Sequence, residues 1–126
     1  MKITSLFKLK RKSADQLVAA DFAEEVQSSC KLWVLKNGTD FLMVDMGSGP
    51  CMPVWSDRHK MLSFLEGKKN TSWRSIAVPL HLFFTVWWPE VRYLSPGIGI
   101  NWCGEQGKQC IVSGKEFERL SGRPEF

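Results

Sequence analysis

Two histidines are the residues of this chain best suited to acid–base chemistry at neutral pH. His59 follows Asp57 and Arg58, and His81 lies at the start of an apolar run. Residues two apart on a helix do not share a face, so Asp57 and His59 are not expected to form an acid–base pair. A helix cap followed by solvated charges accounts for this run, and an anion bound by the free N–H groups of the helix start is the alternative. We therefore predict no catalytic histidine pair.

Four cysteines could supply nucleophiles or metal ligands, but no two of them form a CxxC motif. Cys103 and Cys110 flank a glycine-rich turn at residues 104–107, and across a hairpin their side chains would face each other. Free or core thiols are the expected state, and a disulfide or a metal site is the alternative. A metal would need further ligands, and no other cysteine or histidine is close in sequence. We therefore predict no metal site.

The remaining motifs do not indicate an enzyme. Gly47 and Gly49, like Gly97 and Gly99, form pairs too short to be phosphate-binding fingerprints, and they indicate turns. The carboxylates are scattered, and no cysteine has a recognised nucleophile signature. We predict that the protein is not an enzyme and has no cofactor. A small enzyme that uses His59 or Cys103 is the least supported alternative.

Aromatic residues are the most distinctive part of the composition, with six Trp and eight Phe against one Tyr. Trp is large and its N–H needs an acceptor, so six of them are not all expected at the centre of a small domain. Trp and Arg are favoured at the centres of protein interfaces. We therefore predict a partner-binding surface that contains Trp88, Arg92 and Tyr93, with Trp55 and Arg58 as further contacts. Packing of all six Trp in the core or at its edge is the alternative.

The positive charge is concentrated at the N-terminus. Residues 1–12 carry five of the 17 Lys and Arg and no acid, although the whole chain has a net charge of +4. Such a leader suits nucleic acid, an anionic membrane surface or an acidic partner, and a solvated tail is the alternative. No apolar run approaches the roughly 20 residues of a membrane-spanning helix, and the N-terminus does not resemble a secretory signal. We expect a cytoplasmic protein with reduced thiols and no membrane insertion.

Length and composition predict one domain, residues 13–126, behind this leader. Hydrophobic residues that recur every four positions, or that alternate, mark the helices and strands. The predicted helices are residues 13–29, 57–65, 80–88 and 113–120. The predicted strands are residues 31–36, 41–46, 51–55, 73–80, 98–102 and 109–112. The expected fold is α+β, with a mainly antiparallel sheet of five or six strands and three to four helices packed on it.

Local signals place the ends of these elements. Asn37-Gly38 predicts a hairpin, because both residues tolerate positive φ, and the strands around it are expected to form an antiparallel meander. Ser56-Asp57 predicts the cap of the second helix, and Pro89 is expected to end the third. Ser113 and Glu116 have the spacing of a capping box at the start of the last helix.

Several of these segments resemble a bacterial family. They are KLWVLK at residues 31–36, PVWS at 53–56, IAVPL at 76–80, a Phe- and Trp-rich run that ends at Pro89, and GIGINW at 97–102. Together they resemble the domain-of-unknown-function 2750 family over residues 13–120, and PVWS before a helix is distantly similar to SseB-type domains. The resemblance implies a compact α+β domain with no assigned catalytic residues.

The features above favour a non-enzymatic protein-binding domain. By analogy with small immunity proteins encoded beside secreted bacterial toxins, the sharpest hypothesis is an immunity protein that neutralises a cognate toxin by direct binding. An inhibitor of a nuclease would present acidic surface, whereas this chain is slightly basic, so a toxin that is not a nuclease fits better. The alternative hypothesis is a nucleic-acid or membrane-surface module that uses residues 1–12.

Overall fold

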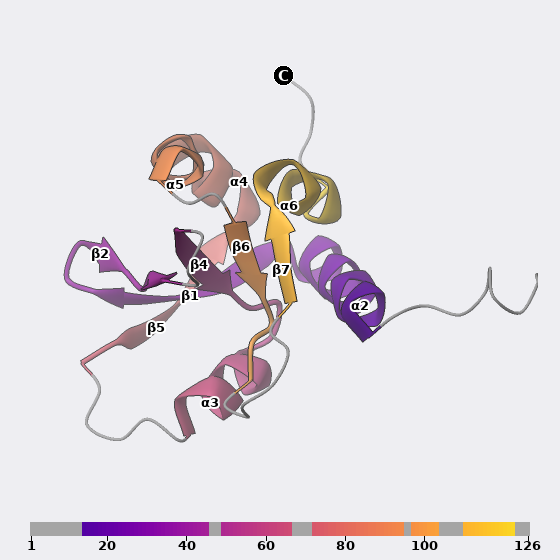
Figure 1. Ribbon diagram of the computed structural model, residues 1–126, viewed down its shortest axis with the longest axis horizontal. Coiled ribbons are helices and arrows are strands. Elements are labelled where there is room, and N and C mark those ends of the chain that lie inside the picture. The colour runs from indigo at the N-terminus through magenta and orange to yellow at the C-terminus, as the bar shows by residue number, and fades with distance from the viewer. Residues whose placement is uncertain (1–13, 46–48, 67–71, 95–96, 104–109, 123–126) are drawn as a thin grey trace, which may run out of the picture.

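The computed structural model describes residues 14–45, 49–66, 72–94, 97–103 and 110–122, which form one α+β domain (Figure 1). The basic leader and the turn at residues 104–107 lie outside the described residues. The strands that the structure describes form two sheets, so the prediction of one sheet with five or six strands is wrong.

The first sheet is antiparallel and has β1 (Lys31–Asn37) at its centre, between β2 (Asp40–Phe41) and β5 (Arg74–Pro79). The predicted hairpin joins β1 to β2. Asn37 pairs with Asp40, so the turn contains Gly38, whose φ is +64°. Positive φ costs glycine little, which explains its place in this turn.

The second sheet has the order β3 (Val44–Asp45), β4 (Pro50–Val54), β6 (Gly97–Ile100) and β7 (Cys110–Ser113). β4 and β6 are parallel, whereas the other two pairs are antiparallel. A parallel pair needs a long crossover, which here contains α3, β5 and the helices that follow it. Hydrophobic alternation does not report strand direction, so the predicted meander missed this pairing.

The predicted strand at residues 41–46 is divided between the two sheets. Its first part, β2, pairs with β1, and its second part, β3, pairs with β4. The sheets are also joined by one bridge between Trp33 and Trp55, whose backbone N–H groups each donate to the other residue's carbonyl at 2.8 and 2.9 Å. β1 therefore continues alongside the end of β4, and this places the β4–α3 turn near the core of the molecule.

Three helices agree with the prediction: α2 (Ala14–Ser29), α3 (Arg58–Glu66) and α6 (Gly114–Leu120). The capping box of α6 is confirmed, because Ser113 Oγ accepts the N–H of Glu116 at 3.2 Å. Phe22 and Val26 of α2 are fully buried, as the spacing predicted.

The helix after β5 does not end at Pro89. It runs through α4 (Leu80–Leu82), a π-helical turn η1 (Phe83–Trp87) and α5 (Trp88–Leu94). Proline in a regular α-helix clashes with the carbonyl four residues earlier. Here that residue is Thr85, which lies in the wider π turn, and the N–H of Trp88 reaches back five residues to the carbonyl of Phe83. The helical chain therefore continues past the proline.

In the part of the chain that the structure describes, the core consists of two hydrophobic clusters. Helices α4, α5 and α6 lie on one side of the strands and α3 on the other, as Figure 1 shows. The larger cluster includes Phe22, Phe83, Trp88 and Phe117, which come from α2 and the helices on the first side. The smaller cluster lies under α3 and contains Trp55, Met61, Phe64 and Trp102 among others.

Candidate functional site

Trp88, the predicted anchor of a partner surface, belongs to the core. Its side chain is 1% exposed, and its ring centroid lies 5.0 Å from that of Phe117. Its indole N–H donates to Glu118 Oε1 at 3.2 Å, so the hydrogen-bonding requirement of the indole is met within the protein. Trp87, its neighbour, is half-buried and lies under the ammonium group of Lys36, 5.4 Å from the ring centroid. The prediction of an exposed Trp anchor here is wrong.

Trp55 is also structural. It is fully buried, and its indole N–H donates to the carbonyl of Trp102 at 2.7 Å. The indole N–H of Trp102 donates in turn to the carbonyl of Cys110 at 2.9 Å. The structure therefore supports the alternative that these Trp side chains serve packing. Arg58 is exposed at the start of α3, on the other side of the strands from α5, so it does not join Arg92 and Tyr93 in one surface (Figure 1).

The outward side of the α4–η1–α5 run is unusually apolar. Tyr93 is 90% exposed, Val86 and Leu94 are each 54% exposed, and Leu82 is 38% exposed. We call these four residues the outer ridge. Leu82 and Val86 are four positions apart, so they are neighbours on the helix surface. Arg92 is exposed beside Tyr93. The prediction named Arg92 and Tyr93 but missed the apolar residues of this surface.

Among the residues that the structure describes, neither histidine is grouped with other residues that could form a catalytic set. His59 and His81 are exposed on different helices. Asp57 Oδ2 accepts the N–H groups of His59 and Lys60 at 3.1 and 3.3 Å, which confirms that Asp57 caps α3.

The four cysteines fall into two groups by exposure. Cys30 and Cys103 are exposed, whereas Cys51 and Cys110 are buried. Burial raises the pKa of Cys51 to about 11, and burial together with the charge of Asp15 raises the pKa of Cys110. Cys110 lies opposite Ile100 in the β6–β7 ladder, so Cys103 does not face it across that hairpin. Among the described residues, no three His, Cys, Asp or Glu side chains are grouped to hold a metal ion.

A polar cluster, the clamp, lies at the carboxyl ends of the parallel strands β4 and β6. Asn101 follows β6 with φ +50°, and its Oδ1 accepts the N–H of Ser56 at 2.9 Å while its Nδ2 donates to Ser56 Oγ at 3.0 Å. Ser56 Oγ donates to Glu25 Oε1 at 2.7 Å, and Glu25 Oε1 also forms an ion pair with Lys60 Nζ. These four residues connect α2, α3 and β6.

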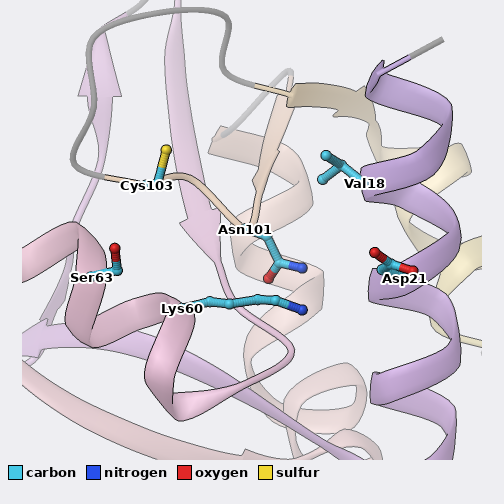
Figure 2. Close-up of a pocket in the computed structure, with 6 residues that line it drawn as sticks. All are labelled: Val18, Asp21, Lys60, Ser63, Asn101 and Cys103. Atoms are coloured by element: carbon cyan, nitrogen blue, oxygen red, sulfur yellow. The ribbon is translucent and has the colours of Figure 1, made fainter.

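A cleft of about 180 Å³ opens beside the clamp, between α2 and α3. Its lining residues are Val18, Asp21, Lys60, Ser63, Asn101 and Cys103. Figure 2 shows Asp21 and Lys60 reaching toward the same space from the two helices, with Asn101 between them. Ligands of open α/β sheets bind outside the carboxyl ends of parallel strands, which is where this cleft lies.

A family model matches residues 19–120, which span all but the first turn of α2 through to the end of α6. The family is described as a protein of unknown function, DUF2750. The chain belongs to this family. The predicted resemblance is therefore confirmed, and no curated protein matches the DUF2750 chain significantly. In the part of this DUF2750 chain that the structure describes, every helix is too short or too polar to span a membrane.

The sequence prediction missed the clamp and the cleft of this DUF2750 protein. PVWS and GIGINW, two segments that carry the family resemblance, contain Ser56 and Asn101, which are joined by hydrogen bonds from the N–H of Ser56 to Asn101 Oδ1 and from Asn101 Nδ2 to Ser56 Oγ. The available signal was a polar residue directly after each of two apolar strands. It would have indicated a site only if β4 and β6 had been predicted to be parallel neighbours.

Proposed function

We propose that this DUF2750 chain is a non-enzymatic protein-binding domain and that its partner docks on the outer ridge. The observation that carries the proposal is the exposure of Tyr93, which leaves 90% of its surface uncovered next to Leu94. Contiguous exposed apolar surface marks interaction sites, and Tyr and Arg are enriched among the residues that dominate binding energy. Arg92 supplies the charged group beside Tyr93.

The ridge is mounted on a helix that is well anchored. Phe83 and Trp88 of the same helical run are buried, and Phe83 packs edge-on against Phe117 with 5.8 Å between ring centroids. A surface that is already ordered loses less conformational entropy when a partner binds. Rigid support of this kind favours a docking role for Tyr93 and Val86.

In its sharpest form, the proposal is that the partner is a cognate secreted bacterial toxin and that this chain is its immunity protein. The support is the small domain, the apolar ridge and the analogy with other small immunity proteins. The chain has a net charge of +4, which suits a target other than a nuclease.

The test is a pull-down with the tagged full chain from the organism that encodes it, at low and high salt, with mass spectrometry of the bound proteins. The ridge variant is Val86→Ser with Tyr93→Ser. Leu62→Ser is the matched control, because Leu62 is also 38% exposed but lies on α3, away from the ridge. A fourth sample omits residues 1–12.

We expect one stoichiometric partner that survives high salt and the deletion. Loss of two ridge side chains should weaken its binding by about 30-fold or more, the effect of a hot spot of about 2 kcal/mol, whereas Leu62→Ser should bind normally. A partner retained by the ridge variant would refute the docking surface. Nucleic acid or lipid that is lost at high salt and on deletion would favour the basic-leader alternative.

A further inference from the structure

The cleft between α2 and α3 is separate from the outer ridge and presents two opposite charges to one space. Asp21 reaches into it from α2 and Lys60 from α3, with Asn101 between them (Figure 2). Lys60 forms its ion pair with Glu25 and not with Asp21. The cleft therefore has a carboxylate on one wall and an ammonium group on the other that do not neutralise each other directly.

Both charged groups retain bonding capacity. An ammonium group has three donor positions, and Glu25 Oε1 is the one acceptor that Lys60 Nζ has among the described residues. Asp21 makes no hydrogen bond or ion pair with any residue that the structure describes. Charged groups that line a cavity in this way can bind complementary charges of a ligand at close range.

The backbone around the cleft is held in an unusual conformation. Asn101 has φ +50°, and outside glycine this left-handed region is sparsely populated and is often found at functional sites. The two hydrogen bonds between Asn101 and Ser56, together with the Glu25–Lys60 pair, hold Lys60 at the cleft wall. The clamp thus positions a donor at the carboxyl ends of β4 and β6, where a ligand site is expected.

We propose that the cleft binds a small zwitterion, specifically a free α-amino acid with a short side chain. Its ammonium group pairs with Asp21, its carboxylate with Lys60, and its side chain packs against Val18. A ligand with only a positive charge would meet Lys60, and one with only a negative charge would meet Asp21 and Glu25, so opposite charges on one molecule fit best. The volume of about 180 Å³ lies below the roughly 300 Å³ at which pockets for drug-sized ligands begin, so the ligand is small, and alanine serves as the probe.

The test is a titration of the full-length, isotope-labelled chain with L-alanine at constant ionic strength. The NMR chemical shifts of the backbone amides report binding. Ethylammonium and propionate serve as probes that carry one charge each. Asp21→Asn removes the carboxylate of the cleft, and Glu90→Gln is the matched control, because it removes an exposed carboxylate from α5. The spectrum of each variant checks that it is folded.

We expect saturable shifts at the amides of the cleft residues, with a Kd on the order of millimolar, as suits a ligand of this size in an open site. Asp21→Asn should weaken binding by about tenfold, the usual effect of losing a charge-assisted hydrogen bond, and Glu90→Gln should have no effect. Each single-charge probe should bind at least about tenfold more weakly than alanine. Shifts that never saturate, an unaffected Asp21→Asn variant, or equally tight binding of ethylammonium would each overturn the proposal. Partner docking on the outer ridge would be unaffected by any of these results.

Discussion

The left-handed backbone at Asn101 and its side-chain hydrogen bonds can be separated by two substitutions at the same position. Asn101→Gly and Asn101→Ala both remove the amide that accepts the N–H of Ser56 at 2.9 Å and donates to its hydroxyl at 3.0 Å. Hydrogen bonds contribute about 0.5–1.5 kcal/mol each, so both variants should lose about 1–3 kcal/mol of unfolding free energy. Ser56 is 5% exposed, which leaves little solvent to replace the lost partner.

The two variants should differ because φ is +50° at this residue. Glycine adopts this conformation without steric cost, whereas alanine pays about 1–2 kcal/mol. Part of that difference is offset by the greater freedom of glycine in the unfolded chain, so the net gap should be about 1 kcal/mol in favour of Asn101→Gly. Urea unfolding measures both free energies on the same scale.

A control variant, Ser56→Ala, removes the hydroxyl that accepts from Asn101 Nδ2 and donates to Glu25 Oε1, but keeps the backbone N–H that Asn101 Oδ1 accepts. Because it also loses two hydrogen bonds, this variant should cost about as much as Asn101→Gly. Combining the two should cost less than their sum, because both remove the bond from Asn101 Nδ2 to Ser56 Oγ. Equal stability of Asn101→Gly and Asn101→Ala would show that the backbone at residue 101 is not held in the left-handed region. Strict additivity with Ser56→Ala would show that the hydrogen bond from Asn101 Nδ2 to Ser56 Oγ contributes no free energy.

Three further predictions concern packing and thiol chemistry. A Cβ at Gly99 would lie 2.4 Å from the indole of Trp102, so Gly99→Ala should lower the free energy of unfolding by about 1–3 kcal/mol, measured by urea unfolding with Trp fluorescence as the signal. In the control Gly114→Ala, the new Cβ would meet its nearest neighbour at 3.5 Å, so the free energy of unfolding should change by no more than about 0.5 kcal/mol. Equal losses of stability in the two variants would contradict the close packing at Gly99. At pH 8, iodoacetamide should modify exposed Cys103 in the folded chain while buried Cys51 resists, as read by mass spectrometry. Burial raises the pKa of Cys51 from 9.0 to about 11, so the thiol loses its proton at a lower pH in the unfolded chain than in the folded one. The free energy of unfolding should therefore fall as the pH rises from about 9 to about 11, and it should fall less in Cys51→Ala. An identical fall in both proteins would exclude Cys51 as its source.

Much of the local structure was predictable because its causes are local. The four-residue spacing of Val18, Phe22 and Val26 predicts α2, since it places apolar side chains on one helical face. Capping by Asp57 and Ser113 depends on side chains that lie within three residues of the N–H groups they accept. These interactions need no knowledge of the rest of the fold.

The candidate site was not predictable in the same way. Glu25 and Lys60 are 35 residues apart, and Ser56 and Asn101 are 45 apart. Their contacts exist only because β4 and β6 are parallel neighbours and α2 packs next to their carboxyl ends. The prediction of exposed Trp side chains was wrong for a related reason. The composition indicates that each indole N–H needs an acceptor, but it does not reveal that Glu118 and the carbonyl of Trp102 are acceptors inside the protein.

By itself, the sequence determined the kinds of elements, most of their ends and the membership of the α+β class, because periodicity and capping act within a few residues. Tertiary structure alone decided that the strand at residues 41–46 divides between two sheets, that the helix continues past Pro89 through a π turn, and that Tyr93 is exposed while Trp88 is buried. The physical reason is that strand pairing and burial depend on which distant segments pack together. The hydrophobic effect that drives this packing is non-directional, so a local hydrophobic pattern does not specify which segments become neighbours.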